Sequence, residues 1–260
     1  MTTGKAIEVK ELTRKFNGLT AVNSISFEVL AGEVFGFLGP NGAGKSTTIN
    51  MLCTILKPTS GHAFVSCCDI TKDPHKVRRE IGIIFQDPSL DDRLTAEDNL
   101  RFHGYLYHMS DKLITERVPE VLNLVELYDR RKEFVRKFSG GMKRRLEIAR
   151  GLLHKPKVLF LDEPTLGLDP QTRAHIWDYV LKMRKETGLT IFMTTHYMQE
   201  AEVCDRAAII DHGKIIDLDT PKNLKSKYNE STLEAVFLKI TGREIRPQAG
   251  ESAWSQWMRR

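Results

Sequence analysis

The sequence predicts an α/β protein with a parallel sheet and an inserted helical segment. Two strand-like runs, 158–161 and 189–194, flank a helix expected over 170–186, which is the βαβ pattern of a parallel sheet. Residues 81–85 are continuously apolar, as expected for a strand buried on both faces. Helical periodicity dominates 87–150, where no strand pattern is found. We therefore expect a helical insertion between two strand-bearing halves.

The N-terminal part alternates strands and short helices. Alternating apolar and polar residues predict strands at 7–12 and 25–30, and the apolar run 34–38 predicts a third. A helix is expected from Ser46 to Leu56, because Pro58 stops it. The next elements expected are a strand at 62–66 and a helix at 74–79.

The remaining elements follow from the same patterns. Helices are expected at 95–109, 111–128 and 140–154 in the insertion, then at 197–204, 221–228 and 231–241, with strands at 207–210 and 214–218. The last residues, 243–260, form a polar tail that we expect to be disordered.

Composition excludes several classes of protein. Of 260 residues, 41% are hydrophobic and 28% charged, which is ordinary for a globular chain. The net charge of +5 is mild, so no nucleic-acid partner is expected. No run approaches the roughly 18 apolar residues that a membrane span needs, and the N-terminus lacks a signal core. We expect a cytosolic protein. Its four cysteines fit no zinc spacing, and we expect them to be reduced thiols.

The segment directly after the strand at 34–38 carries the clearest chemical motif. Gly39, Gly44, Lys45 and Ser46 fit G-x-x-x-x-G-K-[ST], a phosphate-binding loop. Glycines let successive N–H groups point inward around a phosphate, and the following helix directs its positive dipole end at the same anion. Lys45 adds a mobile charge for the outer phosphates, and the Ser46 hydroxyl suits Mg²⁺.

Two carboxylates end the strand at 158–161. Asp162 would reach the carboxyl edge of a parallel sheet, where ligands bind, and is suited to the Mg²⁺ shell. Glu163 could then act on an attacking water, as its general base or by orienting it. Alone, the pair would indicate only solvated acids; beside a phosphate loop, it indicates phosphoryl chemistry.

A second anion seat is predicted at Ser139-Gly140-Gly141-Met142, which opens the basic helix that contains Lys143, Arg144 and Arg145. A single chain cannot easily bring two separate anion-binding sites to the same nucleotide. This suggests that the second seat serves a nucleotide held by another copy.

Three further residues are candidates by position. His196 follows the strand at 189–194 and could contact the terminal phosphate, and Gln86 ends the strand at 81–85, from where it could reach the metal or the water. Phe16 lies ahead of the phosphate loop. It could stack on a purine base or simply cover the sheet edge, and the sequence favours neither.

Over residues 6–241 the chain resembles the ATP-binding subunit of ABC transporters. The motifs follow in that family's order: Walker A (Gly39, Pro40, Asn41, Gly42, Ala43, Gly44, Lys45, Ser46, Thr47), Q-loop (Gln86), signature (Ser139, Gly140, Gly141), Walker B (159–163), D-loop (Leu166 to Asp169) and switch histidine (His196). Phe16 matches the position of the family's adenine-stacking aromatic. The usual signature ends in Gln, whereas this one ends in Met142.

The resemblance implies a P-loop NTPase core with a mixed sheet, an N-terminal antiparallel β subdomain and an inserted helical subdomain. The core would comprise 1–86 plus 151–242, with 87–150 as the helical subdomain and 243–260 as the tail. Two copies of the chain would pair head to tail and bind two Mg²⁺-ATP. Each nucleotide would lie between Walker A of one subunit and the signature of the other, and Asp169 would lie at that interface. A separate integral-membrane permease would hold the subunit on the cytoplasmic face of the cell membrane.

Met142 and the segments 163–170 and 233–243 resemble the ABC-2, daunorubicin-resistance type of exporter. That subgroup implies export of drugs, lipids or polysaccharides. Three alternatives remain open at this stage: a soluble ATPase acting on ribosomes or DNA, a regulatory module without turnover, and an importer ATPase.

Overall fold

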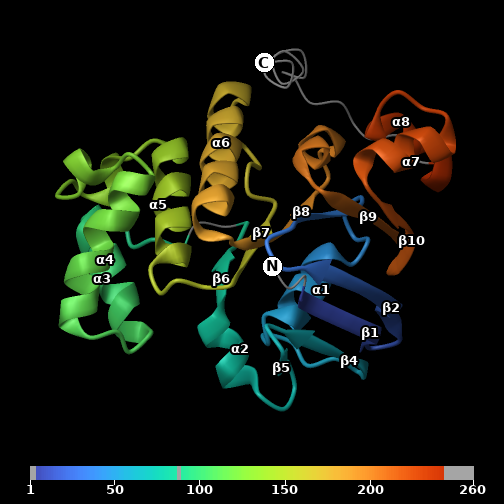
Figure 1. Ribbon diagram of the computed structural model, residues 1–260, viewed down its shortest axis with the longest axis horizontal. Coiled ribbons are helices and arrows are strands. Elements are labelled where there is room, and N and C mark those ends of the chain that lie inside the picture. The colour runs from blue at the N-terminus through green and yellow to red at the C-terminus, as the bar shows by residue number, and fades with distance from the viewer. Residues whose placement is uncertain (1–3, 87–88, 243–260) are drawn as a thin grey trace.

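The computed structural model describes residues 4–86 and 89–242, which form two sheets surrounded by helices (Figure 1). The central sheet has six strands in the order β10-β9-β3-β8-β7-β6, and a second sheet has four in the order β2-β1-β4-β5. In the central sheet, β10 runs antiparallel to its neighbour and the other strands are parallel. The expected mixed α/β sheet and the expected antiparallel sheet are both confirmed.

The central strands are β3 (Val34–Leu38), β6 (Ile81–Ile84), β7 (Val158–Asp162), β8 (Thr190–Thr195), β9 (Arg206–Asp211) and β10 (Lys214–Asp219). Since β3, β8, β7 and β6 are parallel neighbours, their carboxyl ends meet at one edge of the sheet. The phosphate loop, His196, the Asp162-Glu163 pair and Gln86 each follow one of these strands. The topology therefore brings four motifs from distant parts of the sequence to one edge.

The core strands are buried on both faces, which explains their continuous apolar runs. Along β7, Phe160 packs toward the antiparallel sheet, whereas Leu159 and Leu161 pack toward the helices. On the first of these faces, the ring of Phe27 stacks on Phe35 with centroids 5.6 Å apart. This aromatic contact joins the two sheets.

The antiparallel sheet comprises β1 (Lys5–Phe16), β2 (Leu19–Leu30), β4 (Ser60–Val65) and β5 (Cys68–Asp69). Its first two strands are longer than expected, because pairing continues past register shifts that break the alternation of burial. Helix α1 (Lys45–Leu52) packs against this sheet and against β7.

Helices α3 (Ala96–Leu106), α4 (Asp111–Leu124) and α5 (Gly140–Leu152) lie together at one end of the molecule (Figure 1). Thr95 caps α3 by accepting a hydrogen bond from the Asp98 N–H. The helix expected to reach residue 128 ends at Leu124 instead, since Glu126 has a positive φ of 55° that a helix cannot continue. Two 3₁₀ turns, η1 (Tyr128–Arg130) and η2 (Val135–Lys137), lead from there to α5.

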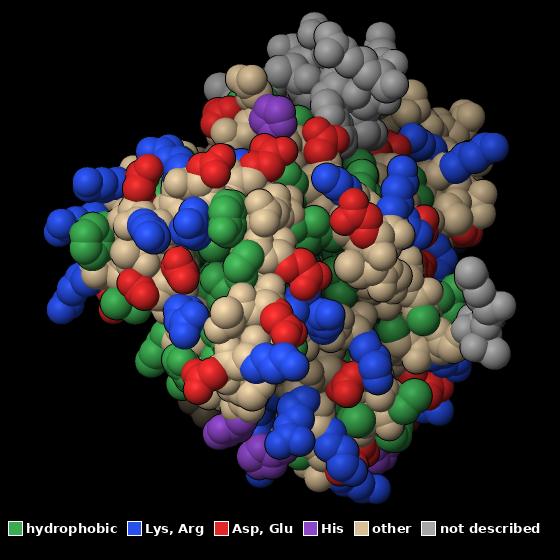
Figure 2. All heavy atoms as spheres, turned by 60° about the vertical axis from the view of Figure 1, so that its left-hand side comes forward, with side chains coloured by type: hydrophobic (Ala, Val, Ile, Leu, Met, Phe, Trp, Pro, Cys, Tyr) green, Lys and Arg blue, Asp and Glu red, His purple; other side chains and the backbone are tan. Residues whose placement is uncertain are grey.

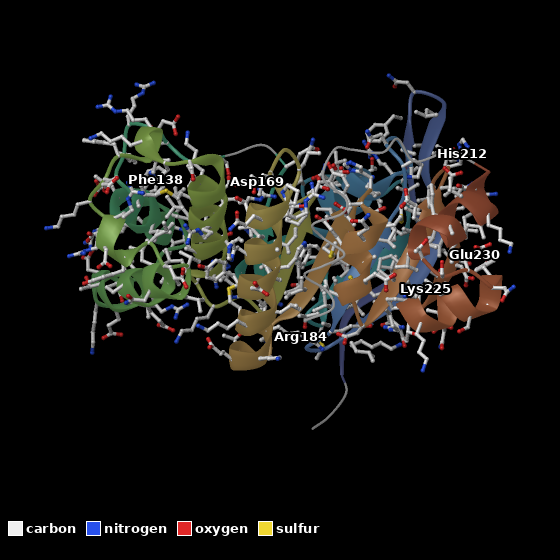
Figure 3. All side chains as sticks on the ribbon, turned by 90° about the horizontal axis from the view of Figure 1, so that it is seen from above. Phe138, Asp169, Arg184, His212, Lys225 and Glu230 are labelled. Carbon is white, nitrogen blue, oxygen red and sulfur yellow. The ribbon has the colours of Figure 1, made fainter. Side chains whose placement is uncertain are left out.

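The other helices are α2 (Pro74–Glu80), α6 (Pro170–Thr187), α7 (Pro221–Tyr228) and α8 (Leu233–Thr241), and the helix expected at 197–204 is the 3₁₀ helix η3 (Met198–Val203). Seen from above, α7 and α8 lie at the opposite end from α3 to α5 (Figure 3). The predicted tail, 243–260, lies outside the described residues.

Candidate active site

The phosphate loop has the conformation that its glycines predict. Gly42 and Gly44 take positive φ angles of 82° and 105°, which side chains rarely adopt. A Cβ on Gly39 would lie 2.3 Å from the carbonyl oxygen of Ile210, so only glycine fits there. Gly44 caps α1, whose first N–H groups face the loop. Backbone N–H groups at a glycine loop and a helix N-terminus are an arrangement that binds phosphate.

Lys45 extends back over the loop rather than into solvent. Its ammonium donates to the carbonyls of Gly39 (2.8 Å) and Pro40 (3.1 Å), and it lies 3.3 Å from Glu163 Oε1. Burial lowers the pKa of Lys45, while the charge of Glu163 opposes that effect. The cation is therefore held at the loop's centre, where phosphate oxygens would exchange with these partners.

Oxygen donors suited to a hard cation meet beside the loop. The Ser46 hydroxyl lies 3.3 Å from Asp162 Oδ1, and the Thr194 hydroxyl donates to the same oxygen. Hydroxyl and carboxylate oxygens next to a phosphate site are the donor set that Mg²⁺ takes in nucleotide-binding proteins. Ser46 and Asp162 thus fit Mg²⁺, and Thr194 holds the carboxylate in place.

Glu163 contacts two of the other predicted site residues. Its Oε2 lies 3.1 Å from His196 Nδ1, and its Oε1 contacts Lys45. Burial raises the pKa of Glu163, but the bond with His196 and the charge of Lys45 outweigh burial and hold that pKa below its usual value. The carboxylate is consequently ionised at neutral pH and able to accept a proton from water.

The backbone at Glu163 is strained, with a φ of 47°. Its N–H donates to the carbonyl of Thr194 at 3.1 Å. On the other side, the buried Arg144 of α5 donates to the carbonyl of Pro164 at 2.5 Å and to that of Phe85 at 2.6 Å. These bonds tie the strained turn to β8, to the end of β6 and to α5.

Arg144 is paired within the protein. It forms an ion pair with Glu147 (2.9 Å), whose other oxygen accepts from the Ser89 N–H at 2.8 Å. Burial lowers the pKa of Arg144, and Glu147 opposes that effect. The neighbouring Lys143 pairs with Asp92 at 2.9 Å. The basic run at the start of α5 is therefore largely engaged with protein partners instead of being free for an anion.

The second predicted anion seat lies at the start of α5, where Ser139 and Gly140 are exposed. Ser139 caps the helix by accepting from the Met142 N–H. A Cβ on Gly141 would lie 2.6 Å from Thr172 Cγ2, so glycine allows α5 to approach α6. Asp169 caps α6 beside it by accepting from the Thr172 N–H at 2.9 Å (Figure 3).

The signature's unusual last residue is almost fully buried. The side chain of Met142 packs in the core, and its sulfur accepts a hydrogen bond from Arg130 at 3.3 Å. It therefore supplies no donor to the exposed seat, which is left with Ser139 and the glycine N–H groups.

Two predicted site residues are not joined to the others by the described contacts. Gln86 is exposed at the end of β6, next to the Phe85 carbonyl that Arg144 holds. Phe16 is 37% exposed on the β1–β2 hairpin, and the guanidinium of Arg14 covers its ring at 4.4 Å. Strand β2 passes the phosphate loop at Ala21, beside Gly44, so both interpretations of Phe16 remain open.

Sequence reasoning missed Thr194, the Arg144–Glu147 pair and Glu200, a buried residue whose carboxyl group accepts hydrogen bonds from Thr165 and Thr195. The i,i+3 spacing of Arg144 and Glu147 was the available signal for the pair. Thr194 lies in an apolar strand, and Glu200 follows His196 by four residues, so neither had a motif to identify it.

Basic and acidic side chains are interspersed on the face drawn in Figure 2. Within residues 4–86 and 89–242, no helix is long and apolar enough to cross a membrane. The same residues contain no cluster of three or more His, Cys, Asp or Glu able to hold a metal by themselves.

Comparison with known proteins agrees with this geometry. The family model described as "ABC transporter" matches residues 22–166. The chain belongs to this family as an ATP-binding and ATP-hydrolysing cassette.

Its relatives include the linearmycin resistance ATP-binding protein LnrL of Bacillus subtilis, 43% identical over 91% of this chain and 75% of the relative. The daunorubicin/doxorubicin resistance ATP-binding protein DrrA of Streptomyces peucetius is 44% identical over 88% of this chain and 69% of DrrA. The resemblance to drug-resistance cassettes is thereby confirmed.

Solved structures share the fold. CbiO1 from Clostridium perfringens, part of the cbiONQ transporter complex, superposes with a TM-score of 0.80 at 33% identity, covering 86% of this chain and 91% of CbiO1. The cassette MJ0796, a dimer in a post-hydrolysis state with ADP and Pi, superposes with a TM-score of 0.74 at 27% identity, covering 82% and 98%.

Proposed function

We propose that two copies of this chain close head to tail around two Mg²⁺-ATP and drive export of a drug, lipid or polysaccharide through a separate membrane permease. The observation that carries the proposal is the separation of two anion seats. The phosphate loop lies with Asp162, Glu163 and His196 at the carboxyl ends of β3, β7 and β8. The other seat, at Ser139, is exposed at the start of α5. A second copy would supply the missing half of each site.

The chain's own residues have separate roles in this proposal. The N–H groups of residues 39–47 and the ammonium of Lys45 bind the phosphates, and Ser46 and Asp162 hold the metal. Bound Mg²⁺ would neutralise charge on the phosphate oxygens. Glu163 acts on the attacking water, as base or by orienting it, and His196 fixes the position of the Glu163 carboxylate through their 3.1 Å contact.

Transmission to the permease would pass through the helical segment, 87–150. Arg144 links α5 to the carbonyls of Phe85 and Pro164, so a displacement near Gln86 or Glu163 would move that segment. The relatives named for linearmycin and daunorubicin resistance support export. In this assignment the cassette is peripheral on the cytoplasmic face of the membrane.

The test measures the ATPase rate against protein concentration, with and without membranes that contain the candidate permease. A rate rising with the square of concentration and stimulated by the membranes supports the proposal. A linear rate that the membranes do not change supports a self-contained ATPase instead. ATP binding without any turnover would favour a regulatory module, or a composite site weakened by Met142.

The catalytic assignment has its own test in Glu163→Gln. This variant should bind ATP normally, lose nearly all hydrolysis and accumulate as ATP-bound dimers on gel filtration. Glu202→Gln is the matched control, because the carboxylate of Glu202 pairs with Lys225 at 2.7 Å. Normal turnover in the Glu163 variant would contradict the role of that carboxylate.

A further inference from the structure

One buried carboxyl group joins the two loops that carry Glu163 and His196. Glu200 on η3 has no exposed surface. Its Oε1 accepts a hydrogen bond from the hydroxyl of Thr165, and its Oε2 accepts from the hydroxyl of Thr195 at 2.8 Å. Thr165 follows Glu163 by two residues, and Thr195 directly precedes His196. The carboxyl group therefore bridges segments that are separated by about thirty residues of chain.

The bridge continues into the backbone around His196. The Thr195 hydroxyl that donates to Glu200 also accepts from the Tyr197 N–H at 2.9 Å. The Glu200 N–H donates to the Tyr197 carbonyl at 3.0 Å. The turn that contains His196 is thus closed by hydrogen bonds on both sides of the histidine.

The contact between Glu163 and His196 depends on the relative position of these two segments. Their 3.1 Å separation can persist only while residues 163–165 and 195–197 stay in register. The pairing of β7 with β8 and the Thr194 hydroxyl, which bonds Asp162 and the Glu163 N–H, join the strand ends, and Glu200 connects the turns beyond them at Thr165 and Thr195.

We propose that Glu200 is a positioning residue for ATP hydrolysis: by bridging Thr165 and Thr195 it holds His196 against Glu163. The inference rests on the proposed roles of Glu163 and His196. Because Thr165 immediately precedes the segment 166–169 expected at the dimer interface, a shift of that segment reaches His196 through the same bridge.

Burial disfavours the charged form of the Glu200 carboxyl group. Burial raises the pKa of Glu200, against the opposing effects of the threonine hydroxyls and of Arg173, whose Nε lies 3.8 Å away. Glutamine can reproduce the neutral form of this group, since its amide oxygen accepts from Thr195 and its amide nitrogen donates to the oxygen of Thr165. Glu200→Gln is therefore the conservative variant that should keep both hydrogen bonds.

The test compares Glu200→Ala, Glu200→Gln and Thr165→Val in the full chain. Small displacements of catalytic groups cost up to about a hundredfold in rate, so we expect kcat to fall about tenfold or more in Glu200→Ala. Thr165→Val removes one arm of the bridge and should lower kcat by a smaller factor. The Kd for ATP should stay within about twofold in both, because the phosphate loop is untouched. Glu200→Gln should restore kcat to within about threefold of the wild type.

A second readout separates positioning from a general structural role. A loss confined to kcat, with the Kd for ATP kept within about twofold and kcat restored in Glu200→Gln, is the result that displacement of His196 predicts, whereas a general loss of structure would lower both quantities. Glu202→Ala on the same turn is the control. Unchanged kcat in both Glu200→Ala and Thr165→Val, or equal losses in kcat and ATP affinity, would overturn the proposal. If Glu163→Gln keeps its turnover in the same assay, the proposed function fails instead.

Discussion

Replacing Arg144 with methionine should cost both stability and turnover, and the two losses should be separable. The guanidinium is 7% exposed and bonds the carbonyls of Phe85 and Pro164 as well as Glu147. Arg144→Met leaves the Glu147 carboxylate, 1% exposed, without its cation. Breaking a buried pair in this way costs about 3–5 kcal/mol, which for a chain of this size lowers Tm by about 6–20 °C.

The double variant Arg144→Met/Glu147→Leu removes both charges. We expect it to recover at least about 2 kcal/mol of the free energy of unfolding relative to Arg144→Met, since the unpaired carboxylate is gone. Turnover should stay low, because nothing then holds the carbonyls beside Gln86 and Glu163. Urea unfolding and steady-state ATPase rates measure the two quantities on the same preparations.

Arg184→Met is the matched control. Arg184 also bonds a carboxylate, Asp205 at 2.7 Å, and a backbone carbonyl, Gly32 at 2.7 Å, but it lies at the far end of α6 (Figure 3). It should lose stability without losing kcat at temperatures where it is folded. If the Arg144/Glu147 double variant recovers wild-type kcat together with its stability, Arg144 serves the fold alone and the reasoning is refuted.

Two other predictions concern an aromatic ring and a partly buried histidine. If Phe16 stacks on adenine, Phe16→Ala should raise the Kd for ATP about fivefold or more at unchanged Tm, since base stacking contributes about 1–3 kcal/mol. An unchanged Kd measured by calorimetry would assign the ring to the sheet edge. Burial holds the pKa of His103 at about 3, against an ordinary 6.5. The unfolded chain therefore takes up a proton that the folded chain refuses, and stability should fall as pH drops below 6.5, by up to about 1.4 kcal/mol per pH unit for this group. His103→Phe should flatten that slope in urea unfolding at pH 5 to 7, and an unaltered slope would contradict the assignment.

The sequence was sufficient to predict the central fold because its strands are continuously apolar and its loops carry spaced motifs. The runs at 34–38 and 81–85 are typical of strands buried on both faces, and the structure places β3 and β6 there in the central sheet. The order of motifs then indicated which strand ends would meet.

Features that depend on contacts between distant segments were not predictable in the same way. β5 has two residues, too few for any periodicity. Arg144 belongs to a run of three basic residues, and only the packing of α5 against β6 and the turn after β7 distinguishes it from Lys143 and Arg145. Glu200 gained its role from burial beside two threonines that lie on other elements.

The central claim, that each ATP site is shared between two copies, is tested most directly by mixing two inactive variants. Lys45→Ala lacks a working phosphate loop, and Ser139→Arg blocks the exposed seat at the start of α5. Each should be inactive alone. In an equimolar mixture half of the dimers are mixed, and each of these has one intact site, so about a quarter of wild-type ATPase activity should return. If Ser139→Arg is fully active alone, or if the mixture stays inactive although mixed dimers form, the site is not shared and the account is contradicted.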